Sequence, residues 1–335
     1  MFGDNIVTSV FFKDLIGHRQ LKKRFTELIT AGRMPHASIF AGAAGLGKTV
    51  AAGAVAAALV GRPVLKHIDF STAESMIHDG EDVFYIGPEK TMLKTGQFRD
   101  LQDIISLRGS SGKRRVFIID HVETMNAEFA NRMLKTLEEP AEGIYFILVT
   151  NRPTLLLPTI ISRCVVFHFE PVPDEELIMS LKERYGYTGA DYEQIAAISD
   201  GNVRTALNFL QDGNSVALDR AFFFVKTVTE SEAPYAEWIA YSADFKDDES
   251  VDIMKWIAMI LRDLLILRTH TSRERLRLKQ CTSRLRAFAP QWSEDAIMKG
   301  LQAIEEGMEG TARHVNIHLI WDYLCISFLQ GRGDY

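Results

Sequence analysis

The sequence predicts an α/β protein: a P-loop core built on a parallel sheet, then a small three-helix module, then an all-helical C-terminal part. Three observations predict this order. A glycine-rich motif lies between an apolar strand and an alanine-rich helix, apolar strands and amphipathic helices then alternate to about residue 170, and only helical patterns follow. Such alternation is typical of a parallel sheet covered on both faces that binds ligands at the carboxyl ends of its strands.

The composition is that of a globular protein with an ordinary core. Of the 335 residues, 47% are hydrophobic and 24% are charged, and a net charge of −6 argues against a general polyanion-binding surface. Cys164, Cys281 and Cys325 are far apart and form no CxxC pair, which argues against zinc and disulfides and suits a reducing cytosol. Without a secretory leader or a bilayer-spanning apolar run, we expect a soluble intracellular protein with no membrane partner.

The glycine-rich motif GAAGLGKT runs from Gly42 to Thr49. Glycines let successive backbone N–H groups turn toward one anion, and the helix N-terminus that follows adds partial positive charge. In such a loop Lys48 reaches the β- and γ-phosphates and the Thr49 hydroxyl binds Mg²⁺. We therefore expect Gly42, Gly45, Gly47, Lys48 and Thr49 to bind a nucleoside triphosphate. The alternative is a glycine turn that merely joins a strand to a helix.

Hydrophobic periodicity and capping signals give the other elements of the core. Strands are expected over residues 37–41, 83–86, 115–120, 144–149 and 165–169. Helices are expected over residues 18–31, 50–60 and 95–105, from an N-cap at Asn126 to residue 137, and from Pro158. Residues 61–82 are irregular and are expected to form a connector with some helix over 73–77.

Pro171 and Pro173 mark the first boundary, and Gly213-Asn214-Ser215 marks a second. Between them, helices are expected over residues 174–185, 191–198 and 202–211, as in a small three-helix module. The best helical patterns beyond are at 251–267 and 315–329. The predicted domains are therefore residues 1–170, 171–212 and 213–335.

Polar residues follow two of the predicted strands. Asp120 ends its strand one sheet position away from the P-loop, where its carboxylate could hold the Mg²⁺ water shell; the alternative is an acid that caps a strand. His121 stands where hydrolytic relatives typically carry a Glu that polarises water, and Glu123 is out of register, so the sequence supports nucleotide binding better than hydrolysis. Thr150 and Asn151 could lie between the γ-phosphate and that strand, or form a simple turn.

Two arginines could contact phosphate. Arg163 is not aimed at its own P-loop by any local argument and could serve as an arginine finger in a neighbour's site, or be a solvated surface residue. Arg204 opens a helix of the three-helix module and could fold back over the phosphates.

Together these pieces resemble AAA+ clamp-loader subunits, and most of all the delta-prime subunits of bacterial DNA polymerase III. The matched stretches are GAAGLGKT at 42–49, IIDHVE at 118–123 with NRMLKTLEEP at 131–140, TIISRC at 159–164 and GNVRTAL at 201–207. By motif, the resemblance covers residues 1 to about 212, and beyond that it is a helical pattern similar to the family's collar domain. It implies an AAA+ core, a lid and a collar through which five subunits form a ring.

The resemblance also implies roles for individual residues. Lys48, Thr49 and Asp120 correspond to nucleotide and Mg²⁺ contacts, Thr150 or Asn151 to sensor 1, Arg204 to sensor 2, and Arg163 to the finger that acts in trans. The four-cysteine zinc module that many relatives carry after the P-loop helix is absent from residues 61–82, so no zinc is expected. His121 replaces the Glu of the motor subunits, which points to a delta-prime-like subunit that binds ATP and Mg²⁺ with weak or no hydrolysis.

The partners implied are the motor and delta subunits in a pentameric ring, the sliding clamp, and primer–template DNA contacted through the assembled complex. The implied location is the bacterial cytoplasm, with nucleoid association during replication. Two alternatives stay open: a hydrolysing, gamma/tau-like motor subunit of the same loader, and an AAA+ adaptor outside replication.

Overall fold

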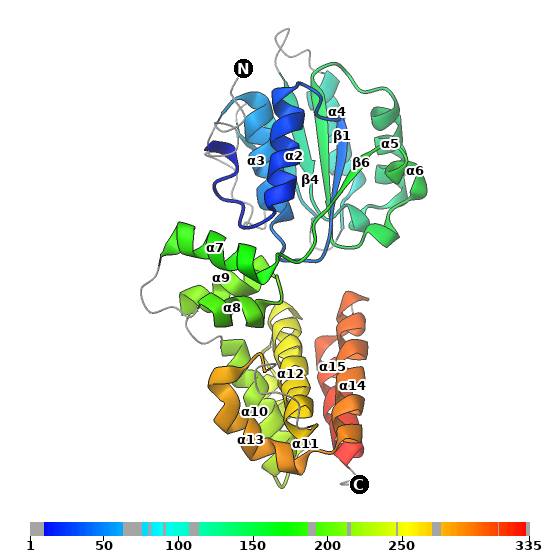
Figure 1. Cartoon of the computed structure of the whole chain (residues 1–335). Helices are drawn as coiled ribbons and strands as arrows, with labels where there is room; N and C mark the ends of the chain where they lie inside the picture. Colours follow the sequence, from blue (N-terminus) through cyan, green and yellow to red (C-terminus); the bar gives the residue numbers. More distant parts are fainter. Residues whose placement is uncertain are drawn as a thin grey trace. The chain divides into compact units, whose positions relative to one another are not determined.

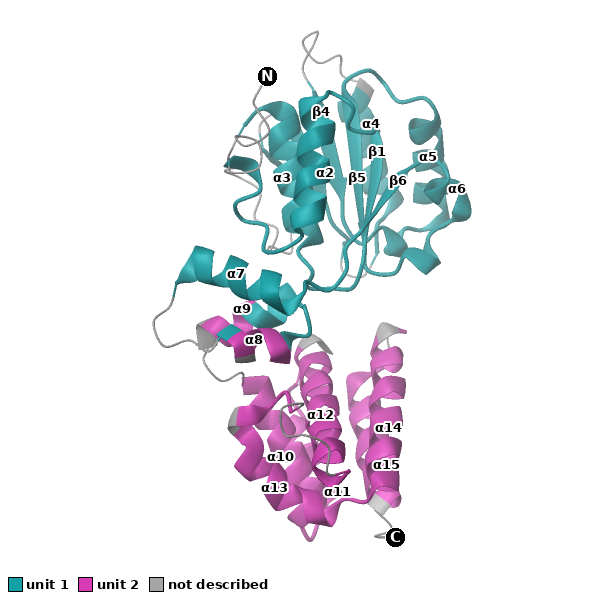
Figure 2. Cartoon of the chain, viewed as in Figure 1, with its two compact units in different colours: residues 1–192, 199–206 teal, residues 193–198, 207–335 magenta. Residues whose placement is uncertain are grey.

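The computed structural model describes residues 10–62, 76–79, 82–89, 92–106, 114–186, 192–212, 216–245, 247–269, 276–313 and 315–332. The chain divides into two compact units (Figures 1 and 2). Unit 1 comprises Met1–Tyr192 with Ser199–Ala206, and unit 2 comprises Glu193–Ile198 with Leu207–Tyr335. Each unit has its own buried core.

A sheet forms the centre of unit 1 (Figure 1). It has six strands in the spatial order β2-β3-β4-β5-β1-β6. The strands are β1 (Ala37–Ala41), β2 (Met76–Asp79), β3 (Val83–Ile86), β4 (Arg115–Ile119), β5 (Ile144–Thr150) and β6 (Val165–His168). Neighbouring strands pair in parallel from β3 to β6, and only β2 pairs antiparallel, with β3. The five predicted strands are confirmed, and the predicted α/β class with them.

Strand β2 is the first correction to the predicted core. Residues 61–82 were expected to carry some helix over 73–77, but Met76 and Ile77 lie in β2, and residues 63–75 lie outside the described part of the chain. β2 pairs with β3 from Met76 opposite Ile86 to Asp79 opposite Val83. A four-residue strand is too short to show its own period, so pairing with a neighbour decides its conformation. The sheet is therefore mixed, although mainly parallel.

Strand order is the second correction. Asp120 was expected to end a strand one sheet position from the P-loop, but β5 lies between β1 and β4, so that strand is two positions away. The register pairs Ala41 with Thr150 and Ile119 with Leu148, which brings the carboxyl ends of all three strands to one edge of the sheet. Local sequence patterns do not specify the order in which parallel strands pair, because each connection is a long crossover.

Helices pack against the sheet and form two separate buried hydrophobic clusters with it. The helices before the module are α2 (Arg19–Thr30), α3 (Lys48–Val60), α4 (Thr95–Ser106), α5 (Ala127–Glu138) and α6 (Pro158–Ile161). Phe40 packs with α2 and α3, whereas its neighbours Ile39 and Ala41 pack in the cluster that contains α4, α5 and α6. This alternation follows from the period of two along a strand. Asn126 caps α5 as predicted, because its side chain accepts a hydrogen bond from the Phe129 N–H at 2.8 Å.

The chain continues as helices: α7 (Asp174–Tyr185), α8 (Tyr192–Ser199), α9 (Val203–Asp212), α10 (Val216–Glu230), α11 (Pro234–Ser242), α12 (Asp247–Arg268), α13 (Thr282–Phe288), α14 (Glu294–Ala312) and α15 (Ile317–Arg332). Single turns of 3₁₀-helix lie at Val122–Thr124, Pro153–Leu155, Lys279–Cys281 and Ala289–Gln291. The three helices predicted for the module correspond to α7, α8 and α9. The two units divide within α8 and α9, the boundary motif at 213–215 lies outside the described residues, and the domain limits at 170 and 212 remain predictions.

Aromatic side chains form much of the core of unit 2. The rings of Trp238 and Trp321 lie 4.9 Å apart between centroids, and those of Phe224 and Phe328 lie 5.0 Å apart. The buried Trp321 Nε1 donates to the Ser250 hydroxyl at 3.1 Å, as a buried indole requires. No helix among the residues that the structure describes has the length and apolarity needed to cross a bilayer.

Candidate functional site

The loop from Gly42 to Thr49 joins β1 to α3 at the carboxyl edge of the sheet. Gly42 must be glycine because a Cβ there would lie 2.3 Å from the Phe169 carbonyl oxygen. Gly45 has a φ of 82°, in the left-handed region that glycine adopts without strain, and a Cβ there would lie 2.4 Å from Asn202 Oδ1. Gly47, with a φ of 84°, directly precedes α3. These glycines allow a tight loop at a helix N-terminus, which is an anion-binding arrangement.

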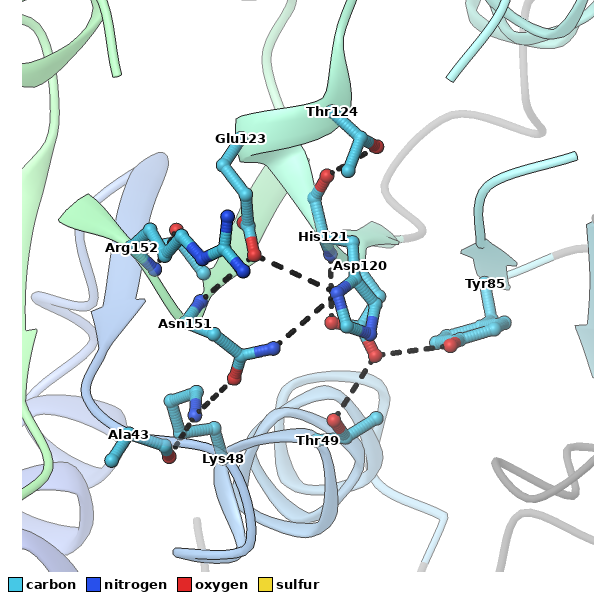
Figure 3. A network of polar contacts seen from close by, with 11 residues as sticks. Ala43, Lys48, Thr49, Tyr85, Asp120, His121, Glu123, Thr124, Asn151 and Arg152 are labelled. Carbon is cyan, nitrogen blue, oxygen red and sulfur yellow. Dashed lines mark hydrogen bonds and ion pairs between the residues drawn. The ribbon is translucent and has the colours of Figure 1, made fainter. Parts of the chain in front are cut away.

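Lys48 is buried at the start of α3, with 4% of the residue exposed. Its Nζ donates to the Ala43 carbonyl at 2.6 Å and to Asn151 Oδ1 at 2.8 Å (Figure 3). Burial lowers the pKa of Lys48 to about 8, against the opposing effect of Asp120 and Glu123. Both hydrogen-bond acceptors are neutral, so a phosphate oxygen would be a better partner for this ammonium group than either.

Thr49 and Asp120 meet across the strand ends. The Thr49 hydroxyl donates to Asp120 Oδ2 at 3.1 Å, and the Tyr85 hydroxyl donates to the same oxygen at 3.0 Å (Figure 3). Asp120 Oδ1 accepts the His121 N–H at 2.8 Å. A carboxylate beside a hydroxyl is the oxygen pair that Mg²⁺ prefers. The residues present therefore fit Mg²⁺ bound together with a triphosphate, in which Thr49 would contact the ion and Asp120 its hydration shell.

Tyr85 was missed by the sequence reasoning. It lies on β3, where it pairs with Ile118 of β4, and its hydroxyl reaches the residue that follows β4. Burial raises the pKa of Tyr85, and the neighbouring Asp120 carboxylate raises it further. The hydroxyl therefore keeps its proton and acts as a donor to Asp120. A tyrosine within an apolar buried strand was the only sequence signal available.

His121 and Glu123 extend this network. His121 has a φ of 53°, and its Nδ1 lies 3.3 Å from Asn151 Nδ2 and 3.6 Å from Glu123 Oε1 (Figure 3). A hydrogen bond with Glu123 raises the pKa of His121 in spite of burial. Burial disfavours the ionised form of Glu123, but hydrogen bonds from His121, the Thr150 side chain and the Asn151 N–H hold its pKa below the ordinary value.

Glu123 is therefore part of the site, although the sequence reasoning set it aside as out of register. The 3₁₀ turn at Val122–Thr124 directs its carboxylate back toward the strand ends, where Glu Oε1 accepts the Asn151 N–H at 3.2 Å. In an extended chain the Glu123 side chain would point away from the strand ends, and the single helical turn reverses that direction. Apart from His121, its partners Thr150 and Asn151 lie about thirty residues further along the chain, so no local pattern could identify them.

The structure distinguishes the two candidates at the end of β5. Asn151 contacts Lys48 directly through its Oδ1. Thr150 is fully buried, its hydroxyl oxygen accepts the Arg152 N–H at 3.0 Å, and its side chain hydrogen-bonds Glu123. Asn151 is therefore the one of the pair that lies beside the P-loop lysine.

The two candidate arginines lie in different surroundings. The Arg204 N–H donates to the Gly45 carbonyl at 3.0 Å, and its positive charge adds to burial in lowering the pKa of Lys48. Arg163 hydrogen-bonds outside this network: its Nη2 donates to Glu138 Oε1 at 2.5 Å and its Nη1 to the Thr159 carbonyl at 2.9 Å. The structure thus gathers every predicted site residue except Arg163 around the P-loop.

Two family models match the chain, and both are described as the DNA polymerase III delta subunit. One matches residues 17–173, and the model of the C-terminal part matches residues 223–328. The chain is 29% identical over 232 residues to DNA polymerase III subunit gamma of Buchnera aphidicola, covering 66% of this chain and 63% of that one. It is 31% identical over 217 residues to subunit tau of Bacillus subtilis, covering 62% of this chain and 38% of that one. The chain thus spans less than two thirds of the length of these relatives.

One solved structure has the same fold over nearly the whole chain. It is a DNA polymerase III gamma subunit-related protein of Thermotoga maritima, with a TM-score of 0.50 and 18% identity, covering 92% of this chain and 99% of that one. At this identity the likeness concerns the fold alone. Because the two delta-subunit models together match well over half of the residues, and the P-loop core has the geometry described above, the chain belongs to the AAA+ clamp-loader subunits of DNA polymerase III.

Proposed function

We propose that the chain is a delta-prime-like subunit of the clamp loader. In this role it binds ATP with Mg²⁺, hydrolyses it weakly or not at all, and supplies Arg163 to the ATPase site of a neighbouring subunit. The observation that carries the proposal is that Lys48, Thr49 and Asp120 lie together at an unbroken P-loop motif while His121 directly follows Asp120.

The contacts of Lys48, Thr49 and Asp120 support nucleotide binding. A buried ammonium group with only two neutral acceptors gains from a γ-phosphate, and the Thr49–Asp120 pair offers oxygens for Mg²⁺. Asn151 already hydrogen-bonds Lys48 and would lie beside the same phosphate, as a sensor 1 residue would. Arg204, whose charge acts on Lys48, would act from the lid side as sensor 2.

The arrangement of His121 and Glu123 supports weak hydrolysis. His121 Nδ1 lies between Asn151, which hydrogen-bonds Lys48, and Glu123. This ring nitrogen is therefore already engaged by two side chains. Glu123 Oε1 accepts the Asn151 N–H at 3.2 Å, and this bond, with the contacts of His121 and Thr150, holds the pKa of Glu123 below its ordinary value. A carboxylate stabilised in its ionised form is a weak base for water. His121 therefore offers no carboxylate, and Glu123 offers only a weakly basic one, to polarise an attacking water.

The surroundings of Arg163 support a role in trans. Its guanidinium is about one third exposed and pairs with Glu138, which is about half exposed. An ion pair this accessible contributes only about 0–1 kcal/mol, so exchange of Glu138 for a phosphate costs little. The planar fork of arginine suits the oxygens of a transferring phosphoryl group.

The partners in this proposal are the motor and delta subunits in a pentameric ring, the sliding clamp, and primer–template DNA through the assembled complex. The proposed location is the bacterial cytoplasm, near the nucleoid during replication. A hydrolysing gamma/tau-like motor is the second candidate, favoured by the sequence relatives and by the buried carboxylate of Glu123 beside His121. An AAA+ adaptor outside replication would differ from both, because it would not co-purify with clamp-loader subunits.

The arginine assignment can be tested in the reconstituted loader. Arg163→Ala should abolish DNA-stimulated ATPase of the complex while leaving its assembly intact. Glu138→Gln is the matched control, since it removes the same ion pair but keeps the guanidinium, and it should retain full stimulation. Unchanged ATPase with Arg163→Ala, in a complex of normal composition, would refute the finger assignment.

A further inference from the structure

Three successive carbonyl groups of the P-loop accept hydrogen bonds from residues outside the loop. The pairs are Ala44 O with Asn202 Nδ2 at 2.8 Å, Gly45 O with Arg204 N at 3.0 Å, and Leu46 O with His18 Nε2 at 2.8 Å. Two of these three donors come from the segment that opens α9, and the third precedes α2. All of them belong to unit 1. The P-loop is therefore tethered from its outer side by two distant parts of the chain.

These tethers fix the direction of the N–H groups that a phosphate needs. A trans peptide unit is planar, and its N–H points opposite to its C=O. Holding the carbonyls of residues 44–46 outward therefore directs the N–H groups of Gly45, Leu46 and Gly47 to the opposite side. Because an unrestrained glycine-rich loop would sample many conformations, restraining it before ligand arrives lowers the entropic cost of binding.

Of the three donors, Asn202 links the start of α9 to the P-loop through its side chain. Its Nδ2 donates to the Ala44 carbonyl, while its Oδ1 accepts the Thr205 N–H at 3.1 Å and so caps α9. The same amide lies so close over Gly45 that a Cβ there would be 2.4 Å from Asn202 Oδ1 and would displace it. One side chain thus joins the start of α9 to the phosphate-binding loop.

We infer that Asn202 is a positioning residue that holds the P-loop amides in their phosphate-binding orientation and links the start of α9 to nucleotide occupancy. The inference rests on the proposed function in so far as the ligand is Mg-ATP. Asn202 contacts no phosphate itself in this account and acts through the Ala44–Gly45 peptide. Its loss should therefore weaken nucleotide binding without removing any group that binds nucleotide.

Asn202→Ser separates the two bonds of this side chain. Serine keeps an oxygen that can cap α9 but is too short to reach Ala44. Asn126→Ser is the matched control, because Asn126 caps α5 through the same kind of bond while its Nδ2 donates to the Thr95 hydroxyl and not to the P-loop. Two quantities should be measured on the full chain: the Kd for Mg-ATP, and the NMR order parameters of the Gly45, Leu46 and Gly47 amides without nucleotide. The melting temperature of each variant reports the structural effect of the substitution.

We expect Asn202→Ser to raise the Kd for Mg-ATP about fivefold, because the substitution removes about one hydrogen bond. Its melting temperature should be close to that of Asn126→Ser. The order parameters should fall from about 0.85 toward 0.6. An unchanged Kd together with unchanged order parameters would overturn the inference. A lower melting temperature with an unchanged Kd would also overturn it, because Asn202 would then only cap α9. If the wild-type chain binds no Mg-ATP, the proposed function fails, and the order parameters alone decide whether Asn202 holds the loop.

Discussion

Lys48 and Arg163 are two of the cations for which we propose phosphate contacts in ATPase sites. Lys48 would act in cis and Arg163 in trans, and their surroundings differ sharply. Lys48 is buried among the strand ends, hydrogen-bonded to Ala43 and Asn151 and surrounded by a polar network that spans four elements. Arg163 lies at the end of a four-residue helix and pairs with one accessible carboxylate. A cation held in place before its ligand arrives suits a site that the chain completes by itself. One held by a weak, exposed pair suits a site that another chain completes.

The sharpest test of this contrast compares alanine substitutions of the two cations. Lys48→Ala removes a buried, charge-assisted contact and should weaken Mg-ATP binding to the isolated chain on the order of 100-fold. Arg163→Ala should leave that affinity within about twofold, because Arg163 hydrogen-bonds outside the network. Equilibrium titration with a fluorescent ATP analogue measures both. A similar loss in the two variants would remove the distinction between a cis and a trans cation.

Asp120→Asn probes the metal part of the network with little change in shape. The amide keeps the volume but loses the charge that Mg²⁺ requires, so affinity for Mg-ATP should fall about tenfold, whereas affinity for ATP in excess chelator should change little. Titrations with and without Mg²⁺ separate the two effects. Equal losses in both conditions would show that Asp120 supports the loop and does not hold a hydrated ion.

The low pKa of Lys48 predicts a pH dependence of binding. In the nucleotide-free chain Lys48 titrates at about 8, so it is mostly charged at pH 7 and only about one tenth charged at pH 9. Because the charged form binds phosphate, the Kd for Mg-ATP should rise about tenfold from pH 7 to pH 9. Calorimetry in buffers of different ionisation enthalpy would also detect the proton taken up on binding. A flat profile over this range contradicts the burial argument for Lys48.

Tyr85→Phe should have the smallest effect. It removes one of the three donors that hold Asp120 and should lower the free energy of unfolding by about 1 kcal/mol and weaken Mg-ATP binding a few-fold. Tyr145→Phe, on strand β5 of the same sheet, is the matched control for loss of a tyrosine hydroxyl. Urea denaturation and ATP titration of both variants give the comparison, and equal effects would leave Tyr85 without a special role.

Local features of the core could be predicted from the sequence. The P-loop, the five main strands and the cap at Asn126 depend on residues close together in the chain, where hydrophobic periodicity and capping chemistry act. The strand β2 and the position of β5 between β1 and β4 could not, because they depend on pairing between distant segments. Tyr85, Glu123 and Asn202 were missed for the same reason. Each reaches the site through a hydrogen bond to a residue about thirty or more positions away.

We propose that this chain binds ATP in a complete P-loop site and does not turn it over efficiently. Equilibrium ATP binding and steady-state ATPase should therefore be measured on the same preparation of the isolated chain, with Lys48→Ala as the control. We expect saturable binding that Lys48→Ala weakens on the order of 100-fold, together with negligible turnover. Robust turnover by the wild-type chain, lost in Lys48→Ala, would contradict it and would make the subunit a motor in spite of His121.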